Sequence, residues 1–195
     1  MANASFKMND VEVFSENNQL VTLNDAVIHG PSMLDIYFNN SDVDALQTLT
    51  TLTRLTDSNS YSSYAPVGTG MTFNSGIFSF PSTGYYKIQG QLYLYSPTSG
   101  GYPWAGVITY WNNSGSTDAT ATGLTGWNQI SGVYDSGYTT GGYGCAYFQA
   151  YVKVTDISNA RIKFVYNSSS TSGRLNGSST YTGTTQFSFI KLRGI

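Results

Sequence analysis

The sequence predicts an all-β protein, from its composition and from one strictly alternating segment. Glycine occurs 21 times and tyrosine 16 times in the 195 residues, and serine, threonine and asparagine are abundant. Such a composition is typical of short strands joined by many turns. Residues 76–96, GIFSFPSTGYYKIQGQLYLYS, contain two alternating apolar runs on either side of a Pro-Ser-Thr-Gly turn. A period of two over this length indicates strands rather than a helix.

The turn in this segment leads into a long strand with two different faces. Pro81 presets φ and Gly84 can adopt a positive φ, so the chain can reverse direction there. Beyond the turn, one face carries Tyr86, Ile88, Gly90, Leu92 and Leu94. The opposite face carries Tyr85, Lys87, Gln89, Gln91, Tyr93 and Tyr95.

The other elements are less uniform. We expect a hairpin around residues 16–19, with Val11 and Val13 before it and residues 20–23 after it, and a short strand at 33–38. Residues 41–56 fit a capped helix, because leucine recurs every three residues, but their threonines favour a strand at 47–56, which we prefer. Later strands are expected at 87–96, 104–111, 127–134, 145–155, 160–167 and 184–193, joined by polar loops.

Three segments resemble parts of one known family. The sequence Phe78-Ser-Phe-Pro-Ser-Thr-Gly-Tyr-Tyr86 is similar to its F-x-x-P-x-x-G-x-Y core, residues 148–167 to its paired late strands, and residues 179–195 to its closing core strand. This family is the jelly-roll superfamily of tumour necrosis factor and the complement globular head. The resemblance covers residues 65–195 and implies a jelly-roll β-sandwich, at 61–195, that forms a homotrimer.

Charge is scarce and unevenly distributed. Charged residues make up 10% of the chain, against about 25% in typical soluble proteins, and this deficit indicates a chain that functions inside an assembly. Residues 1–60 have eight carboxylates against two cations, a net charge of −6, and the remainder has three against seven, a net +4. The difference predicts an acidic attachment segment at 1–60. Chance together with internal pairing of charges is the alternative interpretation.

Few residues point to catalysis or to a cofactor. His29 is the single histidine, and we interpret it as a loop residue; Cys145, the single cysteine, reads as a small buried hydrophobe. Asp42 and Asp44 have the spacing of calcium ligands but lack the rest of an EF-hand loop. A polysaccharide-acting enzyme would need paired carboxylates, which occur here only far apart or as Glu12 and Glu16. We therefore expect no enzyme, no cofactor and no metal.

The sequence also argues against membranes and nucleic acid as partners. The first ten residues lack an apolar signal-peptide core, and no run of about 18 apolar residues follows. No segment is basic enough for nucleic-acid binding. We expect a chain that is made in a cytoplasm and assembled there into a particle.

Tyrosines on two predicted strands are candidates for a subunit interface. On strand 145–155 the face opposite Phe148 and Val152 carries Tyr147 and Tyr151. Tyrosine is enriched at subunit interfaces because its ring is apolar and its hydroxyl is polar. The resemblance implies that Tyr93, Tyr95, Tyr147 and Tyr151 lie near the trimer axis, with Phe187 or Phe189 close by. The alternative is that residues 1–60 of the same chain cover this face.

A second group of aromatic residues lies in or beside polar loops. Tyr102, Trp104, Tyr138 and Tyr143 are candidates for stacking on sugar rings of a host-surface glycan or receptor. Taken together, we predict a non-enzymatic bacteriophage virion protein, a trimeric capsid decoration or fibre knob attached to a lattice protein through residues 1–60. The alternative is the receptor- or carbohydrate-binding tip of a tail fibre. A secreted trimeric ligand like the family's animal members is disfavoured by the missing signal peptide.

Overall fold

The computed structural model describes most of the chain, and it is all-β. The described residues are 5–8, 11–15, 32–56, 66–96, 104–135, 142–169, 173–178 and 185–193. Within these ranges there are 14 strands and no helix. The first two, β1 (Ser5–Met8) and β2 (Val11–Ser15), pair antiparallel with each other and with no other described strand, and the rest form two six-stranded sheets.

Sheet one contains the two longest strands and the C-terminal strand. Its order is β11-β8-β14-β3-β5, and β13 also pairs with β8. The bounds are β3 (Met33–Asn39), β5 (Leu52–Arg54), β8 (Gly84–Tyr95), β11 (Tyr143–Val154), β13 (Arg174–Leu175) and β14 (Gln186–Arg193). Every pairing is antiparallel, and β8 and β11 pair over their full length.

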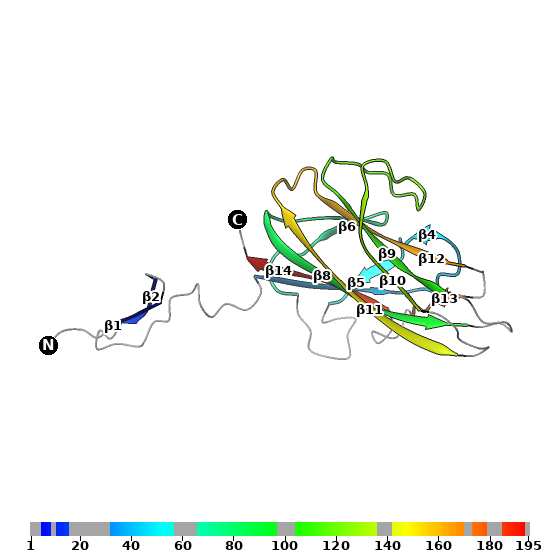
Figure 1. Ribbon diagram of the computed structural model, residues 1–195, viewed down its shortest axis with the longest axis horizontal. Coiled ribbons are helices and arrows are strands. Elements are labelled where there is room, and N and C mark those ends of the chain that lie inside the picture. Colours follow the sequence, from blue (N-terminus) through cyan, green and yellow to red (C-terminus); the bar gives the residue numbers. More distant parts are fainter. Residues whose placement is uncertain are drawn as a thin grey trace.

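Sheet two lies against sheet one to complete the sandwich (Figure 1). Its order is β10-β9-β12-β7-β6, and β4 also pairs with β12. The bounds are β4 (Gln47–Thr48), β6 (Thr72–Asn74), β7 (Ile77–Ser79), β9 (Ala105–Asn112), β10 (Asn128–Asp135) and β12 (Arg161–Ser168). The chain passes between the sheets from β7 to β8, β8 to β9, β10 to β11 and β11 to β12, as in a double-sheet jelly roll.

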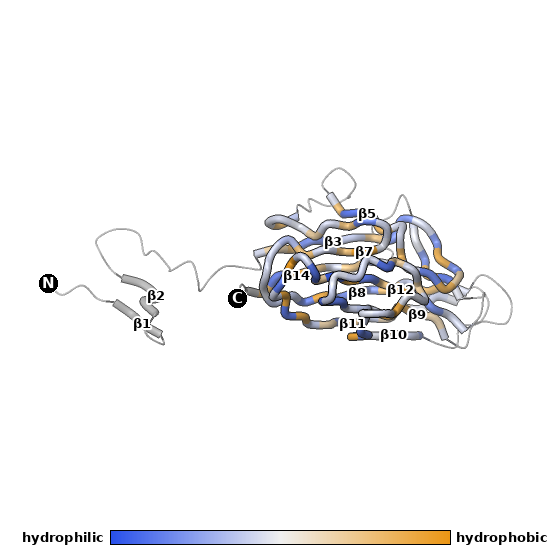
Figure 2. The backbone as a smooth tube through the Cα atoms, turned by 90° about the horizontal axis from the view of Figure 1, so that it is seen from above, coloured by the Kyte–Doolittle hydropathy of each residue, from blue (hydrophilic) through white to orange (hydrophobic). Residues whose placement is uncertain are grey.

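The core fills the space between the sheets with side chains from alternate strand positions. Buried and more exposed residues alternate along β8 and β11, and Figure 2 shows hydrophobic and hydrophilic segments mixed along these strands. Phe164 of β12 stacks on Phe187 of β14 with ring centres 4.2 Å apart, and Phe78 of β7 lies 4.7 Å from Phe189. Strands with a period of two can bury one face in this way while the other stays in water.

The Pro-Ser-Thr-Gly turn that precedes β8 forms as predicted. Gly84 has a φ of 147°, which L side chains rarely adopt. Tyr86 ties the turn to the strand, because its hydroxyl donates a hydrogen bond of 2.8 Å to the carbonyl of Ser82. Lys191 of β14 donates to the Ser82 hydroxyl at 2.8 Å. Burial raises the pKa of Tyr86, with the contacts to Ser82 acting in the opposite direction.

All six later strands are confirmed to within three residues of their predicted ends. The N-terminal predictions need correction. Strand 11–15 pairs with Ser5–Met8, whereas we expected a partner at 20–23, which lies outside the described residues. The helix alternative for 41–56 is wrong. That region forms two short strands in different sheets, where β4 pairs with β12 and β5 with β3.

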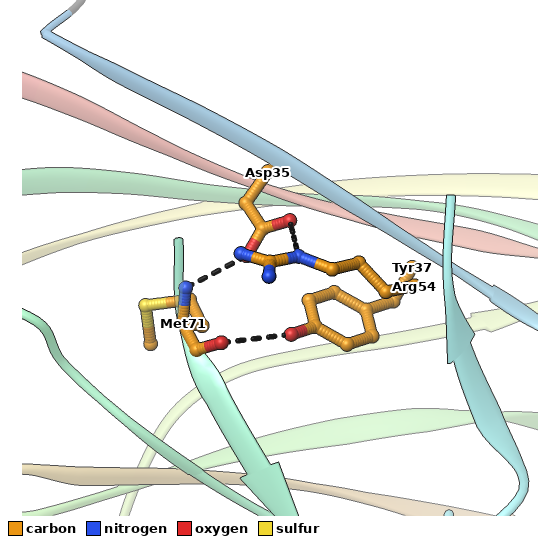
Figure 3. Close-up of polar contacts among 4 residues, drawn as sticks. All are labelled: Asp35, Tyr37, Arg54 and Met71. Carbon is orange, nitrogen blue, oxygen red and sulfur yellow. Dashed lines mark hydrogen bonds and ion pairs between the residues drawn. The ribbon is translucent and has the colours of Figure 1, made fainter. Parts of the chain in front are cut away.

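The predicted boundary at residue 60 is also wrong, because residues 33–56 are part of the sandwich. β3 lies between β14 and β5 in sheet one, so the jelly roll begins at Met33. Acidic residues of this region pair internally: Asp35 with Arg54, and Asp42 with Arg174. The contact between Asp35 and Arg54 is shown in Figure 3. Internal pairing therefore explains part of the charge asymmetry, as the alternative interpretation held.

Candidate subunit interface

The outward face of sheet one exposes tyrosines that the described chain leaves uncovered. Tyr147 and Tyr151 of β11 are 67% and 61% exposed, although both belong to a strand whose alternate residues are buried. Strand geometry explains the contrast, because successive side chains point to opposite sides of a sheet. We call Tyr93, Tyr95, Tyr143, Tyr147 and Tyr151 the tyrosine face. Exposed aromatic groups of this size mark interaction sites more often than free surface.

One end of the tyrosine face is a stack of three rings. Tyr143 lies with its ring centre 4.6 Å from that of Tyr95 and 5.3 Å from that of Tyr93, at interplanar angles of 26° and 21°. The register explains this, because Tyr143 is the cross-strand partner of Tyr95. We predicted Tyr143 as a glycan contact and the other two as interface residues. The structure instead brings all three into one cluster, so that division does not hold.

The middle of the face is a hollow of about 530 Å³. Its outward-pointing lining comes from four strands and contains amide, hydroxyl, aromatic and aliphatic groups: Gln89, Gln91, Gln149, Gln186, Ser188, Tyr147 and Ile36. Backbone register places the amides in adjacent rows, since Gln149 is opposite Gln89 and Gln186 is opposite Gln91. Sequence reasoning placed Gln89 and Gln91 on one face of their strand but missed the cluster, because Gln186 enters it from a strand that is distant in the sequence.

The other end of the face carries positive charge beside tyrosine. Lys87 is opposite Tyr151 in the β8–β11 register, and Lys153 is opposite Tyr85. The ammonium nitrogen of Lys153 lies 5.7 Å from the centre of the Tyr85 ring, within the range of a cation–π contact. The face is thus aromatic at one end, amide-lined in the middle, and aromatic with two lysines at the other.

Phe187 and Phe189 cannot take part in this interface. Both side chains are 0% exposed and contact aromatic residues of sheet two. Within β14, residues 187 and 189 point into the core, whereas Gln186 and Ser188 point outward into the hollow. Cys145, which we expected to be buried, is exposed. It lies two residues before Tyr147 on β11, so both side chains point to the outward face of the sheet.

The glycan candidates are divided by the structure. Tyr102 and Tyr138 lie outside the described residues. Trp104 is 37% exposed beside sheet two and meets Tyr134 edge to face, with ring centres 5.1 Å apart at 82°. The backbone of Trp104 is held by Ser169, whose amide donates to the Trp104 carbonyl at 3.0 Å. Sequence reasoning missed Tyr134, although its outward position follows from the alternation within β10.

The loop between β9 and β10, residues 113–127, is held against the outer side of sheet two by Lys163 of β12. The ammonium of Lys163 donates to three of its carbonyls, those of Asp118, Thr120 and Gly123, at 3.1, 2.9 and 2.8 Å. The same ammonium lies 4.5 Å from the centre of the Trp127 ring. Burial lowers the pKa of Lys163, and the nearby Asp118 carboxylate partly opposes this effect.

Groups that could hold a metal ion do not gather in the described part of the chain. No cluster of three or more histidine, cysteine, aspartate or glutamate side chains occurs among these residues. Asp42 and Asp44, the candidate calcium ligands, face Arg174 at 3.1 and 3.7 Å. His29 lies outside the described residues. Within the same ranges, no helix is long and apolar enough to cross a membrane.

Comparison with known proteins finds a shared fold and no significant match by sequence. No protein-family model matches the chain, and no curated protein matches it significantly. Among solved structures, murine APRIL at pH 5.0 is 12% identical with a TM-score of 0.56, over 82% of this chain and 98% of that one. Eiger TNF from S. frugiperda is 10% identical with a TM-score of 0.55, over 85% of this chain and 96% of that one. The chain is therefore an all-β jelly roll similar to those of tumour necrosis factor-like proteins.

Proposed function

We propose that the chain is a non-enzymatic structural protein that forms a homotrimer through the tyrosine face. The observation that carries this proposal is the exposure of Tyr147 and Tyr151 on the outward face of sheet one. A tyrosine-rich surface suits a contact that is exposed to solvent in the free chain and buried in the assembly. Burial of the apolar ring is favourable, and the hydroxyl can still form a hydrogen bond across the interface. Three copies is the arrangement that the resemblance to the tumour necrosis factor superfamily implies.

The assembly that we propose is part of a bacteriophage virion, as a capsid decoration or a fibre knob. The charged fraction of only 10% supports a chain that depends on assembly for its solubility. Residues 1–31 are the proposed attachment segment, because they precede the sandwich and carry four carboxylates against one lysine. A lattice protein with a basic docking surface would complement them.

The oligomeric state is the direct test of this proposal. Light scattering of the full chain at micromolar concentration should give three times the chain mass of 21.1 kDa. A mass of one chain at these concentrations would refute the trimer.

Deletion of residues 1–31 tests the attachment role. It removes no strand of the sandwich, so the shortened chain should still form a trimer but lose binding to the particle. Retained binding would refute the attachment role.

A second function, glycan binding, is favoured by one observation. Trp104 and Tyr134 form an exposed aromatic pair beside Ser168 and Ser169, whose hydroxyls contact the Trp104 carbonyl. Aromatic rings next to hydroxyl groups suit the apolar face and the hydroxyls of a sugar ring, and three copies on one assembly would add avidity. A glycan panel probed with the intact protein tests this. Binding should be lost in Trp104→Ala and kept in Trp111→Phe, since Trp111 packs against the core.

A further inference from the structure

We propose that Gln89, Gln91, Gln149 and Gln186, the glutamine band, fix the register in which identical subunits meet. This inference rests on the proposed homotrimer and adds the residues that select one arrangement. The band lies across the middle of the tyrosine face and borders the hollow of about 530 Å³. The occupant that we propose for the hollow is the same face of the other two copies of the chain, which converge on it around the threefold axis.

The four amides form two adjacent rows across three strands. In one row Gln149, Gln89 and Ser188 are cross-strand neighbours; in the next, Gln91 and Gln186 are neighbours beside Tyr147. The four glutamine side chains are exposed or half-buried on the outward face, whereas Ser188 is buried between them. Neighbouring strands are about 4.8 Å apart, so the rows present a closely spaced set of donors and acceptors rather than scattered polar groups.

Amide chemistry is the reason why a second copy is the fitting occupant. An amide both donates and accepts hydrogen bonds, so amides that meet their own copies around a threefold axis can pair with one another. Carboxylates or ammonium groups at these positions would repel their own copies, and no charged side chain lines the hollow among the residues described. Apolar groups would attract copies without defining how far one face slides along the other.

The position of the band strengthens this argument. Along β11, Gln149 lies between Tyr147 and Tyr151, which are more exposed than any other tyrosine in the described part of the chain, so aromatic rings flank it on both sides. Rings at these places would exclude water when subunits meet, which strengthens hydrogen bonds between the amides and makes an unmatched amide costly. A buried polar layer of this kind specifies register and oligomeric state in other assemblies, at some cost in stability.

The test compares a charge and an apolar group at the same positions. Gln149→Glu should weaken association roughly 100-fold or more at pH 7, because each interface would bury an unpaired carboxylate. Association should recover at about pH 4 and below, where that carboxyl is mostly protonated and can again donate and accept. The matched control is Gln129→Glu, another exposed glutamine, on β10 of the other sheet, which should behave as wild type at both pH values.

Replacing glutamines of the band with leucine distinguishes an effect on register from an effect on affinity. The double variant Gln89→Leu/Gln149→Leu should associate as tightly as wild type or more so, but native mass spectrometry should show several oligomeric states in place of one. The role of the band would be overturned if the double variant formed only the wild-type trimer and Gln149→Glu associated as tightly as Gln129→Glu. The proposed trimer itself would be unaffected by that result. A monomeric wild-type chain would overturn both. Circular dichroism of each variant checks that the fold is intact.

Discussion

The carboxylate of Asp35 and the guanidinium of Arg54 form a two-pronged ion pair at the edge of the sandwich. Nε contacts Oδ1 and Nη2 contacts Oδ2, both at 2.7 Å. Oδ2 also accepts the backbone amide of Met71 at 2.7 Å, and the Met71 carbonyl accepts the hydroxyl of Tyr37 at 2.9 Å (Figure 3). The pair therefore joins β3, β5 and the segment before β6, and it holds residues 33–56 in the jelly roll.

Removing the cation should be costly, because the Asp35 side chain is 0% exposed. We expect Arg54→Met to lower the free energy of unfolding by about 3 kcal/mol, since it leaves a buried carboxylate with one backbone partner. Urea denaturation measures the change. The control is Arg174→Met, whose partners Asp42 and Asp44 are exposed, with an expected loss below about 1 kcal/mol. Equal losses in the two variants would contradict this account of Asp35.

The loop over sheet two should depend on Lys163. Lys163→Met removes the ammonium that binds three loop carbonyls, so we expect residues 113–126 to exchange amide hydrogens faster and Trp127 fluorescence to shift to the red. The stability loss should be about 2 kcal/mol, in the range for hydrogen bonds to a charged group. Lys153→Met, on the exposed face of β11, is the control and should leave the loop unchanged. Unaltered amide exchange in Lys163→Met would mean that the loop conformation does not depend on the Lys163 ammonium.

Alkaline pH should destabilise the fold through Tyr166. Burial raises the pKa of Tyr166 to about 12, whereas an unfolded tyrosine has a pKa of about 10. As pH rises from 10 to 12 the unfolded chain loses this proton first, so stability present below pH 10 is progressively lost. The loss from Tyr166 approaches about 2.7 kcal/mol. Stability curves against pH should therefore be flatter in Tyr166→Phe than in wild type over this range. Parallel curves would contradict the assignment.

The proposed interface should respond to charge at the tyrosine face. Tyr151→Asp should dissociate the trimer, because burying three unpaired carboxylates costs several kcal/mol. The isolated chain should still fold, since Tyr151 is 61% exposed within it. Tyr134→Asp is the matched control, an exposed tyrosine on the other sheet, and should remain trimeric. Sedimentation equilibrium measures both masses, and a trimeric Tyr151→Asp would place the interface elsewhere.

Strand parity and the turn before β8 could be predicted from the sequence alone. Leu92 and Leu94 are buried and Tyr147 and Tyr151 are exposed, as the alternation predicted, because the period of two follows from the covalent geometry of an extended chain. The φ of Gly84 likewise follows from the local residues. Phe187 and Phe189 were placed by the family resemblance and Cys145 by its residue type, and these predictions were wrong because strand parity decides which side chains point outward.

Sheet order and long-range pairing were decided by the tertiary structure. Nothing local indicates that Asp35 meets Arg54 and Met71, that Gln186 joins Gln89, Gln91 and Gln149, or that Lys163 reaches a loop some 40 residues away. These contacts depend on which strands become neighbours, and that choice is made by packing two sheets over one core. Parity is a property of each strand by itself, whereas the clusters on a sheet belong to several strands at once.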